Sequence, residues 1–153
     1  MNSLTCFSVR PIQKGELNSV YFLEKSLFGD HGYPDFFFRQ SFDCWPRGLQ
    51  VAVDKHNNLL GYILVAPSEQ AQCVWILSVV VDTLAQGRGV GRRLIVDAIT
   101  SLPKHVTEVK LTVAPTNPAR HLYRSLGFIE HCVEEDYFGP GECRVLMLLN
   151  LEP

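Results

Sequence analysis

Glycines recur at every second position in the string Gln-Gly-Arg-Gly-Val-Gly, which spans residues 86–91. An apolar run at residues 75–81 precedes this string, and a helix-like run begins at Arg92 directly after it. Because glycine adopts positive φ at little cost, several N–H groups of such a loop can point at one phosphate. The first turn of the following helix adds unpaired N–H groups and a dipole that favours negative charge. The string therefore predicts a binding site for a phosphate-bearing ligand.

The glycine spacing differs from that of two familiar phosphate-binding loops. A dinucleotide-binding loop needs Gly-x-Gly-x-x-Gly, whereas Gly87, Gly89 and Gly91 follow Gly-x-Gly-x-Gly. A Walker loop needs Gly-x-x-x-x-Gly-Lys followed by Ser or Thr, and the sequence contains no such string. Neither a dinucleotide nor a Walker-type nucleotide site is predicted.

A second set of regularly spaced residues lies downstream, where Ala119, Tyr123 and Gly127-Phe128 follow Ala-x-x-x-Tyr-x-x-x-Gly-Phe. The two sets resemble, in order, two signatures of the GNAT superfamily of acyl-CoA N-acyltransferases. These signatures are Gln/Arg-x-x-Gly-x-Gly/Ala for the loop and Asn-x-x-Ala-x-x-x-Tyr-x-x-x-Gly-Phe downstream. Asn117 stands one place late in the second signature, and Thr116 holds the usual Asn position.

The resemblance implies acetyl-CoA as the acyl donor. In similar proteins the thioester lies along the strand before the glycine loop and pairs with its backbone, here that of Val79, Val80 and Val81. The pyrophosphate would lie on the loop and the start of the helix. The remaining donor-binding residues implied in this way are Gln86, Gly87, Arg88, Gly89, Val90, Gly91, Arg92 and Asn117. Asn117 equally suits the N-cap of a helix that begins at Pro118.

Two tyrosines are expected at the reaction itself. In similar proteins the tyrosine at the place of Tyr123 points at the thioester sulfur, and a phenol with a pKa of about 10 can protonate a departing thiolate. The segment Tyr137-Phe138-Gly139 resembles the Tyr-Tyr-Gly segment that holds the acceptor backbone in several N-terminal acetyltransferases. Tyr123 is the predicted general acid and Tyr137 the predicted acceptor contact.

The general base is not evident. In the branch that acetylates protein N-termini, including the ribosomal-protein alanine acetyltransferases, a Glu or His often occupies the strand position that Thr112 holds here. Because threonine is no base near neutral pH, the amine proton must leave through a water relay or another group. Other candidates are Glu130, Glu134, Glu135, Asp136 and His131. An α-amino group has a pKa near 8 and lysine one near 10.4, so the missing base favours low-pKa amines.

The hydropathy pattern predicts alternating elements that would position these residues. Strands are expected at residues 6–10, 49–53, 59–65, 72–81, 108–113, 128–133 and 143–151. Helices are expected at residues 15–28, at 35–42, after the glycine loop as far as Pro103, and at 118–125. This order also resembles the GNAT family. It implies a single α/β (α+β) domain over residues 1–153, with a mixed, mostly antiparallel sheet of about six to seven strands flanked by about four helices.

Composition agrees with an enzyme of this size. The 153 residues are 46% hydrophobic and 20% charged, which is typical of a soluble globular domain. A net charge of −2 argues against a nucleic-acid partner. The five cysteines include no Cys-x-x-Cys pair, so we expect reduced thiols, mostly in strands, and no metal. The sequence shows neither a signal peptide nor a membrane anchor, which predicts a cytoplasmic protein with no membrane partner.

Together these features predict an acetyl-CoA-dependent N-acetyltransferase that transfers acetyl directly to a primary amine, with a homodimer as a possible assembly. The acceptor is either a peptide N-terminus or a small molecule such as a polyamine, amino acid or aminoglycoside. The alternative from another class is a non-catalytic acyl-CoA-binding or regulatory domain.

Overall fold

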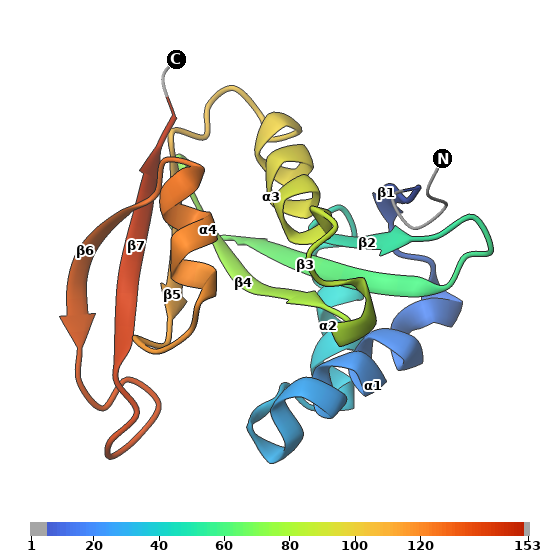
Figure 1. Ribbon diagram of the computed structural model, residues 1–153. Coiled ribbons are helices and arrows are strands. Elements are labelled where there is room, and N and C mark those ends of the chain that lie inside the picture. Colours follow the sequence, from blue (N-terminus) through green and yellow to red (C-terminus); the bar gives the residue numbers. More distant parts are fainter. Residues whose placement is uncertain (1–5, 152–153) are drawn as a thin grey trace. The chain divides into compact units, whose positions relative to one another are not determined.

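The computed structural model describes residues 6–151, and Figure 1 shows their helices and strands. In this range the strands are β1 (Ser8–Pro11), β2 (Leu49–Val53), β3 (Leu59–Pro67), β4 (Cys73–Val81), β5 (Glu108–Val113), β6 (Ile129–Glu134) and β7 (Arg144–Asn150). The helices are α1 (Leu17–Phe28), α2 (Asp35–Cys44), α3 (Val90–Thr100) and α4 (Ala119–Ser125). Short 3₁₀ turns lie at Lys14–Glu16, Gly29–His31 and Thr83–Ala85. The predicted α/β class and element order are confirmed.

The strands form a mixed sheet in the order β1-β2-β3-β4-β5-β7-β6. The pairs β1–β2, β2–β3, β5–β7 and β6–β7 are antiparallel, whereas β4 and β5 are parallel. The parallel ladder joins residues 73–75 to residues 108–110, so it uses only the first third of β4. The predicted strand at Val79, Val80 and Val81 is confirmed, and it lies beyond this ladder.

The contacts of the chain divide it into two compact units, which we describe separately. Within the described residues, the first unit contains residues 6–65 and 78–101, and the second contains residues 66–77 and 102–151. The glycine loop lies in the first unit, and both predicted reaction tyrosines lie in the second. A single domain over residues 1–153 stays a prediction, and residues 1–5 and 152–153 lie outside the described part.

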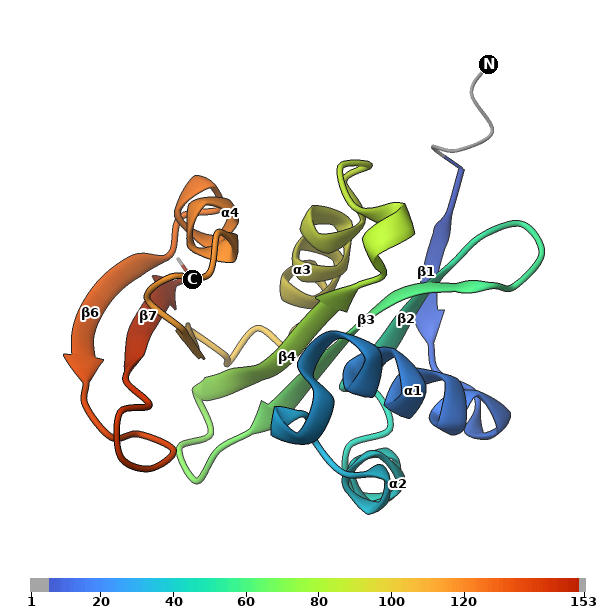
Figure 2. The same ribbon diagram turned by 60° about the horizontal axis from the view of Figure 1, so that its bottom comes forward.

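In the first unit, helices cover both faces of the strands, with α1 and α2 on one face and α3 on the other (Figures 1 and 2). Two neighbouring residues of β3, Gly61 and Tyr62, show that successive side-chain positions face opposite sides of the sheet. The Tyr62 ring packs edge-to-face on Phe38 of α2, with 5.6 Å between centroids. A Cβ on Gly61 would instead meet Leu94 of α3 at 3.4 Å. Successive strand residues point to opposite faces, so β3 contributes to the core on both sides.

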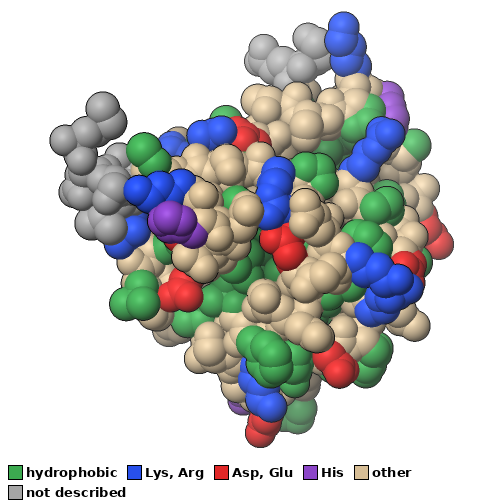
Figure 3. Space-filling view, turned by 90° about the vertical axis from the view of Figure 1, so that its right-hand side faces the viewer, with side chains coloured by type: hydrophobic (Ala, Val, Ile, Leu, Met, Phe, Trp, Pro, Cys, Tyr) green, Lys and Arg blue, Asp and Glu red, His purple; other side chains and the backbone are tan. Residues whose placement is uncertain are grey.

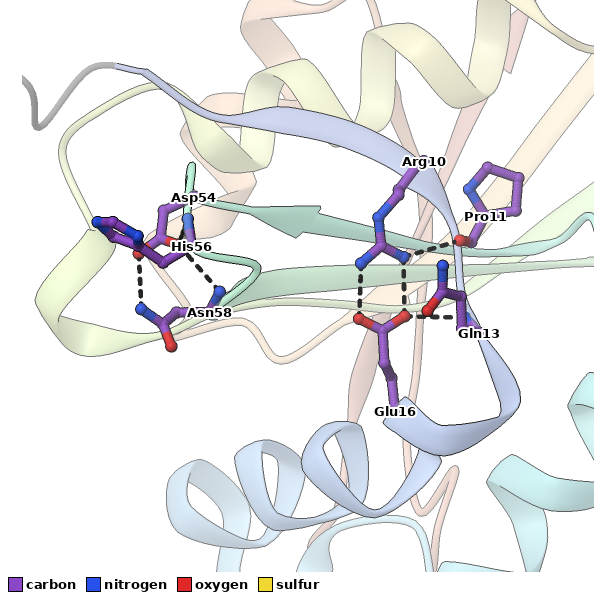
Figure 4. Close-up of polar contacts among 7 residues, drawn as sticks. All are labelled: Arg10, Pro11, Gln13, Glu16, Asp54, His56 and Asn58. Carbon is purple, nitrogen blue, oxygen red and sulfur yellow. Dashed lines mark hydrogen bonds and ion pairs between the residues drawn. The ribbon is translucent and has the colours of Figure 1, made fainter.

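The connection from β1 to α1 is fixed by an ion pair, drawn in Figure 4. The Arg10 guanidinium donates to both carboxylate oxygens of Glu16, at 2.8 and 2.7 Å. The same carboxylate accepts the N–H of Gln13 at 2.8 Å and so caps the 3₁₀ turn before α1. These bonds hold the pKa of Glu16 below its ordinary value, with the Arg10 hydrogen bond as the main cause.

The loop between β2 and β3 is organised by Asp54 (Figure 4). Its Oδ1 accepts the N–H groups of His56 and Asn58, at 2.8 and 2.9 Å. Asn57 between them has φ of 63°, which Asn tolerates better than most residues.

In the second unit, β7 lies between β5 and β6, and the core comes from alternating residues of β5 and β7. Leu111 and Met147 are its largest fully buried side chains. The Tyr123 ring of α4 and Phe128, which follows α4, pack against each other with 5.9 Å between centroids. Every residue of β6 is exposed, as befits a strand at the sheet edge.

Some sequence expectations need correction. Helix α3 ends at Thr100, before Leu102, because Pro103 disfavours the α conformation in the residue that precedes it. Helix α4 begins at Ala119, one residue after the expected start. Of the five cysteines only Cys73 is buried, and three are exposed. The expectation that the thiols lie mostly in strands is wrong, because Cys6, Cys44 and Cys143 lie outside the strands.

Charges of both signs lie side by side on the face shown in Figure 3, with hydrophobic side chains between them. In residues 6–151 none of the helices has the length and apolar character needed to cross a membrane. The same residues contain no group of three or more His, Cys, Asp or Glu side chains arranged to hold a metal ion.

Candidate functional site

The glycine loop has the backbone conformation that its sequence predicts at two of its three glycines. Gly87 and Gly89 have φ of 82° and 80°, in the left-handed region that glycine favours. A Cβ at either position would meet no atom within 4 Å, so backbone conformation, not space, selects glycine here. Gly91 instead lies in the first turn of α3, so the expectation that all three glycines form the loop is corrected.

The start of α3 offers N–H groups to an anion. Gly89 is the N-cap, and the first intrahelical bond runs from the Arg93 N–H to the Gly89 carbonyl at 3.0 Å. The N–H groups of Val90 and Gly91 come before that bond, in the part of the first turn that the helix ladder does not pair. The first turn carries no acidic residue. This end of α3 therefore combines N–H donors, the positive end of a helix dipole and no opposing carboxylate.

Side chains around the loop have different partners. The Gln86 amide donates to the Val81 carbonyl at 3.3 Å, which joins the end of β4 to the start of the loop. Arg93 is held by Asp97 at 2.9 Å along the exposed side of α3. Arg88 is half-buried and Arg92 exposed beside the same loop. Gln86 thus stabilises the turn, while Arg88 and Arg92 supply positive charge next to the N–H groups.

Tyr123 is 8% exposed, which is low for a tyrosine. Burial raises its pKa to about 12, and the nearby positive charge of Arg144 opposes that rise. The phenol therefore keeps its proton at neutral and moderately alkaline pH. A protonated phenol in an apolar setting is suited to donate a proton to a stronger base that forms beside it.

Arg144 was not singled out from the sequence. Its Nε donates to the Thr112 hydroxyl at 3.2 Å and its Nη2 to the Thr112 carbonyl at 3.0 Å. Its guanidinium also lies 5.2 Å from the centroid of the Phe138 ring. The strand position at which similar enzymes carry a base thus holds a neutral side chain bonded to a cation. Arg144 begins β7, diagonally across from Thr112, so only the strand register identifies it.

Tyr137 lies in the loop between β6 and β7. Its N–H donates to the Glu142 carbonyl at 2.9 Å, and its ring contacts Phe138 edge-to-face at 4.8 Å. Its side chain is 39% exposed, so the ring is accessible. Within the second unit a series of contacts therefore runs from Tyr137 to Phe138, from Phe138 to Arg144, and from Arg144 to Thr112.

The acidic candidates for a base lie on or just after β6. Glu130 binds Arg120 at 2.5 Å and also Arg124, and these hydrogen bonds, Arg120 first, lower its pKa. A carboxylate whose pKa is lowered is a poorer proton acceptor. His131, Glu134, Glu135 and Asp136 are exposed, and Asp136 accepts the Gly141 N–H at 2.8 Å within the loop.

Asn117 acts on the start of α4. Its Oδ1 accepts the Ala119 N–H at 2.9 Å, so the side chain caps the first turn of the helix. The neighbouring Arg120 N–H donates to the Asn117 carbonyl. The N-cap of α4 is Pro118, so Asn117 lies one residue before the predicted cap position, although its side chain bonds the first turn as a cap would. Contact of Asn117 with the donor stays a prediction.

A buried polar chain in the first unit was also missed. The Tyr62 hydroxyl donates to Glu24 Oε1 at 2.5 Å and lies 2.9 Å from the Ser78 hydroxyl. The Tyr33 N–H donates to Glu24 Oε2 at 2.9 Å. Glu24 is 3% exposed. The sequence could have indicated that Glu24 is buried, because it lies four residues after Val20 in α1 and residues four apart share one face of a helix.

Residues 16–128 match the family model described as the acetyltransferase (GNAT) family. A comparison with curated proteins finds no significant match. Many solved structures share the fold, including the following three. Ard1 from Thermoplasma volcanium is 18% identical with a TM-score of 0.88, covering 97% of this chain and 99% of its own. The ribosomal-protein-S18-alanine N-acetyltransferase from Escherichia coli is 20% identical with a TM-score of 0.79, covering 96% of this chain and 95% of its own.

The third structure is Naa20 from Chaetomium thermophilum, solved in complex with a bisubstrate analogue. It is 25% identical to this chain with a TM-score of 0.81, and the match covers 94% of this chain and 86% of its own. The family model and these folds agree with the resemblance carried by the loop and by Tyr123.

Proposed function

The chain belongs to the GNAT acetyltransferase family, and from that premise we propose that it transfers an acetyl group from acetyl-CoA to a primary amine. The observation that carries this proposal is the family match over residues 16–128 together with the positive φ of Gly87 and Gly89 at the start of α3. Acetyl-CoA supplies a thioester that an amine can attack, with the thiolate as leaving group.

The first unit offers the features that the acyl donor needs. We assign the pyrophosphate to N–H groups of the glycine loop and of the first turn of α3, over residues 87–92, beside the positive charge of Arg88. We assign the acyl arm to the backbone of β4 at Val79, Val80 and Val81, which lies beyond the parallel ladder. Backbone pairing places no demand on side chains, so the valines can pack in the core and still serve the donor.

The second unit supplies the proton donor. In this proposal Tyr123 donates its phenol proton to the departing sulfur, because burial keeps the phenol protonated until a stronger base forms. The charge of Arg144 opposes the effect of burial and stabilises a transient phenolate. Asn117 holds the start of the helix that carries Tyr123, and its proposed contact with the donor is secondary to that role.

The acceptor that we propose is an α-amino group, above all a peptide N-terminus. Thr112 offers no base, and an α-amine with a pKa near 8 needs less help than a lysine amine near 10.4. Naa20, which is 25% identical, was solved with a bisubstrate analogue, which fits an enzyme of this kind. The accessible ring of Tyr137 is the proposed contact with the acceptor backbone.

The decisive experiment measures release of CoA thiol from acetyl-CoA with three acceptor sets: peptides with free N-termini, N-terminally blocked peptides with one lysine, and small amines. Turnover with free N-termini alone supports the proposal in full. Turnover only with small amines keeps the acetyltransferase and overturns the acceptor. Acetyl-CoA binding by calorimetry without turnover on any set would instead indicate a non-catalytic acyl-CoA-binding domain.

A further inference from the structure

Three hydroxyl and carboxyl groups form a continuous chain in the first unit, each from a different element. The Ser78 hydroxyl of β4 lies 2.9 Å from the Tyr62 hydroxyl of β3, which lies 2.5 Å from the Glu24 carboxylate of α1. Tyr62 is fully buried and Glu24 nearly so, whereas Ser78 is half-buried. The chain therefore runs from a partly accessible hydroxyl to a carboxylate in the interior.

Ser78 is next to the proposed acyl-donor strand. It directly precedes Val79 in β4, and consecutive strand residues are about 3.3 Å apart along the strand. Its side chain points to the face of the sheet that α1 and α2 cover, because it meets Tyr62, whose ring contacts Phe38 and whose hydroxyl contacts Glu24. Of the three hydrogen-bonded groups, the Ser78 hydroxyl is therefore the one nearest in sequence to Val79, where the proposed thioester site begins.

We propose that Ser78, Tyr62 and Glu24 form a proton relay that removes the proton from the acceptor amine, in place of the base that Thr112 cannot supply. This inference rests on the proposed acetyltransferase function. The amine nitrogen bonds to the acetyl carbon, and the C–S bond breaks with its electron pair left on sulfur. The amine proton passes to Ser78 Oγ, the Ser78 proton to Tyr62 Oη, and the Tyr62 proton to Glu24 Oε1. Before the next turnover, Glu24 returns its proton through Tyr62 and Ser78 to solvent, and the Tyr123 phenolate takes up a proton from solvent.

The chemistry of each group suits its place. A hydroxyl both donates and accepts, so Ser78 and Tyr62 can each pass a proton without bearing a lasting charge. Burial, and then the negative charge of Glu24, raise the pKa of Tyr62 well above its ordinary value, which keeps the phenol protonated between transfers. The Tyr33 N–H on Glu24 Oε2 leaves Oε1 for Tyr62. The groups that face the Tyr62 hydroxyl are Glu24 from α1, Ser78 from β4 and Tyr33 after α1, while α2 contributes the apolar Phe38 ring.

The test compares Ser78→Ala, Ser78→Thr and Tyr62→Phe in the full chain, with acetyl-CoA and the acceptor peptide that the wild type prefers. Ser78→Ala breaks the first link and leaves the Tyr62–Glu24 bond in place, while Ser78→Thr keeps a hydroxyl. We expect kcat at pH 7 to fall at least tenfold in Ser78→Ala and Tyr62→Phe and to recover in Ser78→Thr, with acetyl-CoA affinity unchanged. The loss of kcat in Ser78→Ala and Tyr62→Phe should become smaller as the pH is raised. At high pH more of the amine is already neutral and hydroxide can take its proton, so the relay is needed less.

Ser41→Ala is the matched control, since it removes another buried hydroxyl of the first unit, bonded at 2.7 Å to the Phe37 carbonyl and outside the relay. Its kcat should stay within twofold of the wild type. Unchanged kcat in folded Ser78→Ala, or an equal loss in Ser78→Thr, overturns the relay while leaving the acetyltransferase intact. A wild type that turns over no amine overturns both proposals. If Tyr62→Phe unfolds, Ser78→Ala and Ser78→Thr decide alone.

Discussion

Tyr123 offers a test of proton donation that leaves packing nearly unchanged. Tyr123→Phe keeps the ring against Phe128 and removes only the hydroxyl. We expect kcat to fall by about a hundredfold or more, as for loss of a general acid, with acetyl-CoA affinity within twofold of the wild type. Steady-state kinetics and calorimetry measure the two effects. Because the pKa of Tyr123 is raised to about 12, its deprotonation should not limit wild-type activity on the alkaline side until the pH approaches that value.

The role of Gly89 can be separated from backbone strain by a second glycine. Gly89 and Gly141 have φ of +80° and +79°, and a Cβ at either would meet nothing within 4 Å. Alanine at each position should therefore cost a similar amount of stability, about 1–2 kcal/mol. We expect Gly89→Ala to weaken acetyl-CoA binding at least tenfold and Gly141→Ala to leave it unchanged, as measured by calorimetry. Equal affinities in the two variants would refute the phosphate site.

Among single residues, the sequence predicted those whose role depends on the local backbone. Gly87 and Gly89 were predicted from their spacing, because positive φ is a property of one residue. Arg144 was missed because its partner Thr112 is 32 residues away in the chain. Glu24 was missed because its partner Tyr62 is 38 residues away, and only the packing of α1 on β3 brings them together.

At the scale of elements, the boundaries were predicted well where hydropathy alternates within a strand. Residues 49–53 and 108–113 are strands as expected, since both alternate or bury apolar residues in a short run bounded by turn residues. The first residue of a helix was harder to predict where a capping side chain determines it. Helix α4 begins after Pro118 because the Asn117 side chain caps the Ala119 N–H, and sequence alone does not tell which residue after an Asn takes that bond.

The junction between β1 and α1 should make stability depend on pH. The pKa of Glu16 is lower in the folded chain than the value of about 4.3 expected in the unfolded chain. The contribution of ionised Glu16 to the free energy of unfolding is therefore complete above its pKa in the unfolded chain. This contribution is lost as the pH falls through the pKa of Glu16 in the folded chain. We expect Glu16→Gln to cost about 1–2 kcal/mol at pH 7 and much less at low pH, measured by urea unfolding.

The Arg39–Asp43 pair provides the control for that measurement. It is an i,i+4 pair with side chains 50% and 53% exposed, so Asp43→Asn should change stability by less than about 0.5 kcal/mol. The Arg10 and Glu16 side chains are 25% and 20% exposed, and the carboxylate also caps a backbone N–H. A loss from Glu16→Gln no larger than that from Asp43→Asn would show that the junction contributes no more than an ordinary surface pair.

At the scale of the whole molecule, the net charge of −2 means that overall charge does not draw a polyanionic donor to the protein. In the proposed donor site, affinity therefore comes from local groups, namely the N–H groups at the start of α3 and the arginines beside them. Such binding resists salt better than binding through a broad basic surface, because directed N–H bonds do not depend on long-range attraction.

Binding of acetyl-CoA should accordingly stabilise the whole chain against heat. A ligand at a hundred times its Kd stabilises the folded state by about 2.7 kcal/mol, which for a chain of this length raises Tm by roughly 5–10 °C. We expect this shift in the wild type and in Tyr123→Phe, because proton donation is not needed for binding, and a much smaller shift in Gly89→Ala. Differential scanning fluorimetry with acetyl-CoA, CoA and no ligand measures it. If acetyl-CoA leaves the Tm of the wild type unchanged, the donor site proposed at the start of α3 is wrong, whereas a normal shift without turnover points to acyl-CoA binding without catalysis.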